Sequence, residues 1–189
     1  MGMPHVVEHW TREKVWALPE DGQRRELIDG ELVVTPAPTD LHQRAVGELY
    51  FLLRLALSRT PETAARLLFS PADISLGEDE ILQPDLFIYV NPEGRGVRDW
   101  TDISSLLVAI EMLSPSTARY DRGLKRLRYQ RARVLEYWIV DLDGRVAERW
   151  RPDDARPEIL NTRLQWSSGD GAEVDLDLEA FFREVAGTD

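Results

Sequence analysis

The 189-residue sequence contains no cysteine. Without thiols it forms neither a disulfide nor a thiolate metal site, so oxygen and imidazole groups would have to bind any metal ion, which favours hard cations. Long apolar runs are missing as well, and none approaches the roughly 20 residues of a membrane-spanning helix. The opening MGMPHVVEHWTREK also lacks the apolar core of a signal peptide. These absences predict a cytoplasmic protein with no membrane partner.

Positive charge is also in short supply. The chain carries 23 Lys and Arg against 34 Asp and Glu, which gives a formal net charge of −11 at pH 7. A protein that binds nucleic acid usually presents a basic surface, so this charge argues against such a partner unless the basic residues are gathered locally. One stretch does gather them, and it contains Arg119, Arg122, Lys125, Arg126, Arg128, Arg131 and Arg133. This stretch is either a phosphate-binding patch or a solvated helix face.

Hydrophobic residues make up 43% of the chain and charged residues 30%, which is typical of a globular protein with a sizeable core. No internal repeat, low-complexity tract or long linker interrupts the sequence. We therefore expect one domain over residues 1–189, with its core over about 25–150 and a C-terminal hairpin and helix over 151–189.

The hydrophobic periodicity predicts an α/β fold. Asp-Gly pairs at 29–30 and 143–144 are typical of tight hairpin turns, because they accept positive φ values. The apolar runs LFIYV and LLVAIEML indicate strands buried on both faces of a sheet. Thr39 or Asp40 is placed to cap a long helix. We predict a mixed β-sheet flanked by helices, with antiparallel hairpins added. The predicted helices span residues 12–18, 40–58, 117–132 and 175–187. The predicted strands span residues 66–70, 72–76, 86–90, 106–113 and 136–142.

Two carboxylates interrupt the apolar strands. Asp85 follows Pro84 immediately before LFIYV, and Glu111 lies near the end of LLVAIEML. Burial of an unpaired carboxylate is costly, and the usual remedy is a cationic partner, a proton or a metal ion. If both strands belong to one sheet, the two acids converge on a shared divalent ion that relieves their repulsion. The alternatives are a strand-entry turn for Asp85 and a loop cap or an arginine pair for Glu111.

A lysine adds a third element. On the helix predicted after Glu111, Lys125 lies four residues after Asp121 and four before Tyr129, so these three side chains share one face. Two carboxylates, Mg²⁺ and a lysine are the parts needed to hydrolyse a phosphodiester, because the metal activates water and the lysine steadies the developing negative charge. The alternative is a solvated lysine paired with Asp121, an interaction of about 0.2–0.5 kcal/mol.

These residues carry a resemblance to a known family. Pro84-Asp85, followed by Glu111 at the end of a buried strand, resembles the core of the PD-(D/E)xK nucleases. The longer run IEMLSPSTARYDRGLKRLRYQRARVLEYWIVD is similar to the Uma-type family of bacterial proteins assigned as restriction endonucleases. The similarity extends back through ELIDGELVVTPAPTDLH and QPD, over about residues 25–142. The resemblance implies a restriction-endonuclease-like fold and a metal-dependent endonuclease that acts on nucleic acid, with DNA as the favoured substrate.

The resemblance also implies roles for individual residues. Asp85 and Glu111, with the main-chain carbonyl of Met112, would hold Mg²⁺ or Mn²⁺. In the superfamily, a lysine is expected two residues after the second acid, here Glu111, but this sequence has Leu113 at that position. Members of the Uma-type family have a lysine further on, so the resemblance implies that Lys125 positions or deprotonates the attacking water. Second-rank candidates for the site are His42, Glu31, Asp73 and Tyr129, and candidates for substrate contacts are Arg122 and Arg126. Cleavage of both strands of a duplex suits a homodimer.

Two other functions compete with this one. A catalytically inactive nucleic-acid-binding or regulatory module of the same fold is favoured by the net charge and by the displaced lysine. A phosphatase is suggested by IVDLDGR, which imitates the strand-then-DxDG motif whose first aspartate, here Asp141, attacks phosphorus. That motif normally opens a long α/β domain, whereas only the segment 146–189 follows here, so an Asp-Gly hairpin turn explains the sequence better.

Overall fold

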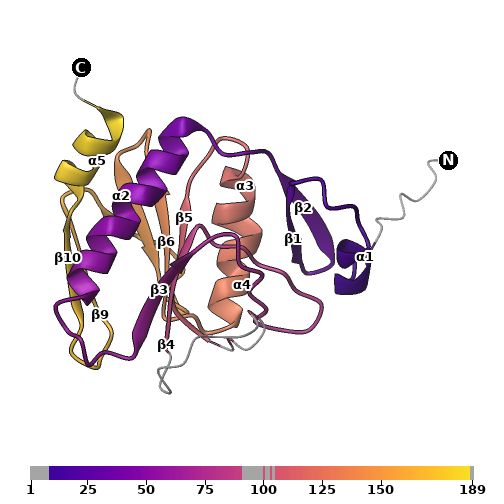
Figure 1. The fold of residues 1–189 in the computed structure, drawn as a ribbon, viewed down its shortest axis with the longest axis horizontal. Coiled ribbons are helices and arrows are strands. Elements are labelled where there is room, and N and C mark those ends of the chain that lie inside the picture. The colour runs from indigo at the N-terminus through magenta and orange to yellow at the C-terminus, as the bar shows by residue number, and fades with distance from the viewer. Residues whose placement is uncertain (1–8, 91–99, 101–102, 104, 188–189) are drawn as a thin grey trace.

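A six-stranded mixed sheet forms the centre of the computed structural model, which describes residues 9–90, 100, 103 and 105–187 (Figure 1). The strands follow the order β3 (Ala65–Phe69), β4 (Leu86–Val90), β5 (Leu106–Met112), β6 (Glu136–Asp141), β7 (Val146–Trp150) and β8 (Glu158–Leu160). β5 and β6 pair in parallel, and the other neighbours are antiparallel. This arrangement confirms the predicted fold class.

Helices cover both faces of the sheet. One face packs against α2 (Asp40–Leu57), α5 (Leu178–Ala186) and the hairpin of β9 (Arg163–Ser167) and β10 (Glu173–Asp177). The other carries α3 (Ala118–Tyr120), a π-helical turn η2 (Asp121–Lys125) and α4 (Arg126–Arg131), flanked by the hairpin of β1 (Arg24–Ile28) and β2 (Glu31–Thr35) and by α1 (Arg12–Trp16). Among the described residues, no helix combines the length and apolar character that crossing a bilayer requires.

The alternation of side chains along β5 decides where Glu111 lies. Ile110 and Met112 belong to the core beneath α2, whereas Ala109 belongs to the core on the α4 side. Successive residues of a strand point to opposite faces of a sheet, so Glu111 shares the face of Ala109. Phe87 and neighbouring aromatic rings fill the same face. Glu111 is therefore a buried carboxylate on a face that is largely apolar.

The predicted hairpins and the cap of the long helix are confirmed. Asp29 and Gly30 have φ values of 51° and 81°, as a tight turn requires, and β1 pairs antiparallel with β2. β6 and β7 form the second hairpin, but the positive φ in its turn lies at Arg145, at 50°, and not at Asp143 or Gly144. Thr39 caps α2, because its side chain accepts a hydrogen bond from the backbone amide of His42.

Three other elements differ in extent from the prediction. The helix predicted over 175–187 begins only at Leu178, because the preceding residues alternate between exposed and buried and pair with β9 as strand β10. The first helix stops at Trp16, since Pro19 disfavours helical geometry at the residue before it. The segment 72–76 forms an isolated bridge between Ile74 and Leu82, and the chain turns again at Asp79 with φ of 48°.

The helix predicted over 117–132 is not uniform. Its middle, η2, is a π-helical turn between α3 and α4, in which i→i+5 hydrogen bonds insert an extra residue into the turn. Asp121, Lys125 and Tyr129 are all buried, whereas Leu127 is 40% exposed. The face that carries Asp121, Lys125 and Tyr129 therefore packs against the sheet, together with the partly buried Leu124.

Candidate active site

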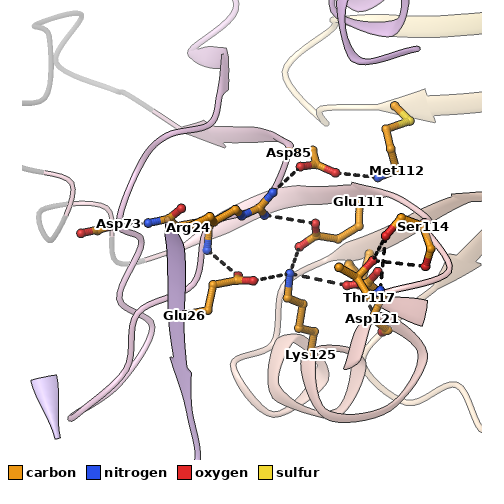
Figure 2. A network of polar contacts seen from close by, with 12 residues as sticks. Arg24, Glu26, Asp73, Asp85, Glu111, Met112, Ser114, Thr117, Asp121 and Lys125 are labelled. Carbon is orange, nitrogen blue, oxygen red and sulfur yellow. Dashed lines mark hydrogen bonds and ion pairs between the residues drawn. The ribbon is translucent and has the colours of Figure 1, made fainter. Parts of the chain in front are cut away.

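Asp85 and Glu111 lie beside each other on neighbouring antiparallel strands. The register pairs Leu86 of β4 with Ile110 of β5, so the residue before Leu86 lies next to the residue after Ile110. Both acids are buried, with exposed fractions of 4% and 2%. The structure thus brings together the two carboxylates that stand out in the sequence (Figure 2).

Three groups contact the Asp85 carboxylate. Its Oδ1 accepts a hydrogen bond from Arg24 Nη1 at 2.7 Å. Its Oδ2 accepts one from the Met112 amide at 2.8 Å and lies 3.2 Å from His42 Nε2. Burial alone would raise the pKa of Asp85, but His42, the charge of Arg24 and the Met112 amide outweigh it and hold this pKa well below its ordinary value. Asp85 is therefore ionised at neutral pH.

Lys125 joins three carboxylates. Its Nζ lies 2.7 Å from Glu26, 2.9 Å from Glu111 and 3.5 Å from Asp121, and its side chain is 2% exposed. Burial would lower the pKa of Lys125, but the attraction of these three acids outweighs it and raises the pKa above its ordinary value. Lys125 is therefore a buried ammonium group, unlike the solvated helix lysine that its basic neighbours in the sequence suggest.

Acidic side chains outnumber basic ones in this buried cluster. It contains four carboxyl groups, from Glu26, Asp85, Glu111 and Asp121, against the guanidinium of Arg24 and the ammonium of Lys125. Burial raises the pKa of Glu111 well above its ordinary value; Lys125 opposes this shift, and the charges of Asp85 and Asp121 add to it. Burial also raises the pKa of Asp121. The cluster therefore favours uptake of a proton or of a further cation.

A cavity of about 350 Å³ gives a ligand access to the cluster. One part of its wall is the connection from β2 to α2, and another is the connection from β5 to α3. It is lined by Arg24, His42, Asp85, Glu111 and Lys125 together with the segments 35–39 and 114–117. Both acids and the lysine thus face one space in which a substrate group can lie.

Two of the second-rank candidates are connected to the cluster. His42, near the start of α2, touches Asp85 directly. Asp73 is connected through Gln83, whose side chain donates to Asp73 Oδ1 at 2.6 Å and whose backbone amide donates to Glu26 Oε1 at 2.8 Å. His42 therefore contacts one of the two acids directly, whereas Asp73 is linked to the cluster only through Gln83.

The other two second-rank candidates do not line the cavity. Tyr129 is fully buried, and its ring centre lies 4.7 Å from that of Tyr137, so its contacts are those of a core residue. Glu31 is exposed at the turn end of the β1–β2 hairpin, outside the residues that line the cavity.

The basic stretch after Glu111 is largely paired within the chain. Arg122 donates to Glu148 at 2.6 Å and to Asp141 at 2.8 Å, and the Arg126 guanidinium lies 4.7 Å from the ring centre of Trp150. Both lie outside the residues that line the cavity. Further pairs are Arg128 with Glu80, Arg131 with Asp29, and Arg133 with Asp153. Little of this stretch is left as a free phosphate-binding patch.

Asp141 has the contacts of a turn residue. Its Oδ1 accepts a hydrogen bond from the Gly144 amide at 2.9 Å, across the turn between β6 and β7. Its other oxygen pairs with Arg122. These contacts agree with an Asp-Gly hairpin and give no support to a phosphatase nucleophile.

Two residues of the cluster, Arg24 and Glu26, are not predicted from the sequence. Both come from β1, whose sequence RRELI gives no more than a short polar strand. Glu26 is fully buried, and Arg24 lies between Asp85 and Glu111. Glu26 could have been found in the sequence, because it directly precedes the apolar pair Leu27-Ile28 in a predicted strand. A carboxylate beside buried apolar residues is the same pattern that singles out Glu111.

The oxygen donors fit a hard divalent cation. Mg²⁺ commonly takes one or two protein carboxylates, keeps several waters and adds substrate phosphate. Asp85 and Glu111 supply two carboxyl groups that line the same cavity. In the part of the chain that the structure describes, no group of three or more His, Cys, Asp or Glu side chains is arranged to hold a metal.

Comparisons with known proteins bear on the family and the fold. Residues 12–181 match the model of the Uma2 family, which is described as "Putative restriction endonuclease". The fold is similar to the crystal structure of "a putative nuclease belonging to DUF820" from Anabaena variabilis, with a TM-score of 0.77 and 18% identity, over 93% of this chain and 99% of that one. No curated protein matches the chain. The family resemblance and the restriction-endonuclease-like fold predicted from the sequence are thus confirmed.

Replacement of Lys125 tests the buried ion pairs. We expect Lys125→Met to lower the free energy of unfolding by about 3–5 kcal/mol, because three buried carboxylates lose their shared cation. Urea denaturation measures this loss. Arg163→Met is the matched control, because Arg163 pairs with Asp175 at the surface and its loss should change stability little. A Lys125→Met protein as stable as the wild type would contradict the assignment.

The raised carboxyl pKa values predict a pH dependence for the metal-free protein. Because Glu111 and Asp121 have raised pKa values when folded, the folded state binds more protons than the unfolded state above pH of about 4. Stability is therefore lost as the pH rises through the folded pKa values, and lowering the pH through these values should raise the melting temperature in EDTA as long as the pH stays above about 4. The depressed pKa of Asp85 acts in the opposite sense, but only below pH of about 4.

Glu111→Gln should flatten this profile, whereas Glu173→Gln, at an exposed position, should keep the slope of the wild type. Thermal melts in a series of buffers provide the comparison. Equal slopes for the wild type and Glu111→Gln would show that Glu111 does not hold the additional proton.

Proposed function

The chain belongs to the Uma2 family, and from that premise we propose that it is a metal-dependent endonuclease that hydrolyses phosphodiester bonds of DNA. The observation that carries the proposal is the buried cluster itself. Asp85 and Glu111 lie on adjacent strands, Lys125 Nζ lies 2.9 Å from Glu111, and all three line one cavity. Buried carboxylates with a neighbouring cation at the wall of a cavity are the arrangement expected at a catalytic centre.

Asp85 and Glu111, with the main-chain carbonyl of Met112, are the residues that would hold Mg²⁺ or Mn²⁺. When bound, such an ion polarises the phosphoryl group and lowers the pKa of a water molecule. The hydrogen bonds from His42 and the Met112 amide keep Asp85 ionised and fix its orientation. These contacts leave the carboxylate ready to bind a cation without rearrangement of the strands.

Lys125 supplies positive charge beside the reacting phosphate. Its ammonium group lies within 3.5 Å of three carboxylates, and each of them favours the protonated form. A lysine held in this way stabilises negative charge and positions a water molecule through its N–H donors, so we assign it these tasks and not that of a general base.

The pairing of the basic residues limits how this chain can contact the phosphates of a substrate. Most of those near the site are paired with acids of the same chain, so the phosphate contacts of this chain are few and close to the cavity. A homodimer would double these contacts and place two sites on the two strands of a duplex. The same pairing favours the rival proposal, a catalytically inactive nucleic-acid-binding or regulatory module, and activity separates the two.

A cleavage assay on single-stranded, duplex and branched DNA tests the proposal. With Mg²⁺ or Mn²⁺ we expect cleavage that EDTA stops. Asp85→Asn and Glu111→Gln should each lower the rate by about 100-fold or more, because each removes one charged group from the reaction centre. Asp175→Asn is the control, since it removes an exposed carboxylate of β10 that pairs with Arg163.

Calorimetric titration of Mg²⁺ or Mn²⁺ into the same proteins distinguishes the endonuclease from the inactive module. Metal binding by the wild type that is lost in Asp85→Asn, without cleavage of any substrate, would favour the inactive module. Cleavage that persists at the same rate in both site variants would contradict the site as well as the mechanism.

A further inference from the structure

Arg24 occupies the space between the two acids of the proposed metal site. From β1, its Nη1 donates to Asp85 Oδ1 at 2.7 Å, and its Nη2 lies 3.5 Å from Glu111 Oε2 (Figure 2). The guanidinium therefore bridges the same pair of carboxylates that would hold a divalent cation. It serves as their cation in the structure of the protein alone.

The guanidinium is only partly satisfied in this position. It has five N–H donors, yet within the described residues its Nε and Nη2 are buried without a hydrogen-bond partner. The side chain is 24% exposed and lines the cavity. A forked set of spare donors at a cavity wall is suited to a phosphate group, which accepts two parallel hydrogen bonds from arginine.

We propose that Arg24 has two positions: it holds Asp85 and Glu111 in the metal-free protein, and it releases them to bind the substrate's phosphate group when a divalent cation takes its place. This inference rests on the proposed function, because it takes the two acids as the metal ligands. A guanidinium 2.7 Å from Asp85 Oδ1 and a metal ion on the same carboxylate would repel each other at close range. Arg24 and the metal therefore compete for the acids.

Competition of this kind has opposite consequences for two ligands. Only molecules in which Arg24 has released the two acids can bind the metal, so the apparent metal affinity of the wild type is lower than the affinity of the released state. Loss of the guanidinium therefore raises the measured affinity. The same loss removes a phosphate ligand, so a phosphate compound binds less tightly to the metal-loaded protein. Loss of a fixed positive charge would by itself shift the two affinities in these directions. Arg24→Lys, which keeps the charge but lacks the forked donors, is therefore the variant that separates a phosphate ligand from a nearby charge.

Titration calorimetry on the full chain tests the proposal with Arg24→Gln. Mn²⁺ is titrated first, and thymidine 5′-monophosphate is then titrated into the Mn²⁺-saturated protein. We expect the Kd for Mn²⁺ to fall by roughly 5- to 150-fold, the range usual for coupling between two sites, and the Kd for the nucleotide to rise by a comparable factor.

The matched control is Arg25→Gln. Arg25 is the next residue of β1, and it binds Asp21 and the Pro19 carbonyl, away from the residues that line the cavity. It should leave both affinities unchanged. Asp85→Asn, made in the wild type and in Arg24→Gln, shows whether the Mn²⁺ measured is the Mn²⁺ of this site.

The outcomes separate this inference from the proposed function. Equal Mn²⁺ affinity in the wild type and Arg24→Gln, with binding lost in Asp85→Asn, would overturn the role of Arg24 and leave the metal site intact. Tighter Mn²⁺ binding with unchanged nucleotide affinity would overturn the second position of Arg24. Absence of Mn²⁺ binding in both proteins would overturn the proposed metal site and this inference together.

Arg24→Lys separates loss of the forked donors from loss of charge, and it also serves if circular dichroism shows that Arg24→Gln does not fold. Lysine keeps the charge but lacks the forked donors. We expect nucleotide affinity to fall as in Arg24→Gln, and Mn²⁺ affinity to rise by a smaller factor. An Arg24→Lys protein with both affinities equal to those of the wild type would contradict the proposal.

Discussion

The excess of negative charge in one buried cluster is the constraint on which the rest of the site depends. Removal of a carboxylate from water costs several kcal/mol unless donors replace the lost solvation. Asp85 has the Met112 amide and Arg24, and Lys125 serves Glu26, Glu111 and Asp121. These contacts stabilise the cluster without a metal, yet its acidic side chains still outnumber its basic ones, which is the property that the proposed metal site requires.

The fold supplies the geometry through backbone features. The antiparallel register of β4 and β5 sets Asp85 beside Glu111, and the alternation along β5 turns Glu111 toward the side of α4. The π-helical turn buries Lys125 and Asp121 on that side. The β1–β2 hairpin then brings Arg24 and Glu26 from the first part of the chain. The site therefore draws on four separate segments, and loss of any one would leave unpaired buried charges.

Much of this arrangement could be predicted from the sequence, because its signals are local. A carboxylate next to a buried apolar run is an anomaly at Asp85 and again at Glu111, and the turn at Asp29-Gly30 and the cap at Thr39 each involve a few adjacent residues. The family model and the similar structure then confirm the family and the fold.

The remainder could not be predicted because it depends on tertiary contacts. The burial of Lys125 follows from acids at positions 26, 111 and 121 that meet only in the folded chain. No periodicity marks the π-helical turn. Arg24 belongs to a short polar strand, and its role appears only when that strand lies beside the ends of β4 and β5.

Anomalous diffraction from wild-type crystals soaked in Mn²⁺ tests the central claim most directly. The account predicts an anomalous peak within about 2.3 Å of carboxylate oxygens of both Asp85 and Glu111, with the guanidinium of Arg24 moved away from Asp85. Crystals that show no peak between these two acids, with Arg24 still hydrogen-bonded to Asp85 at saturating Mn²⁺, would contradict it.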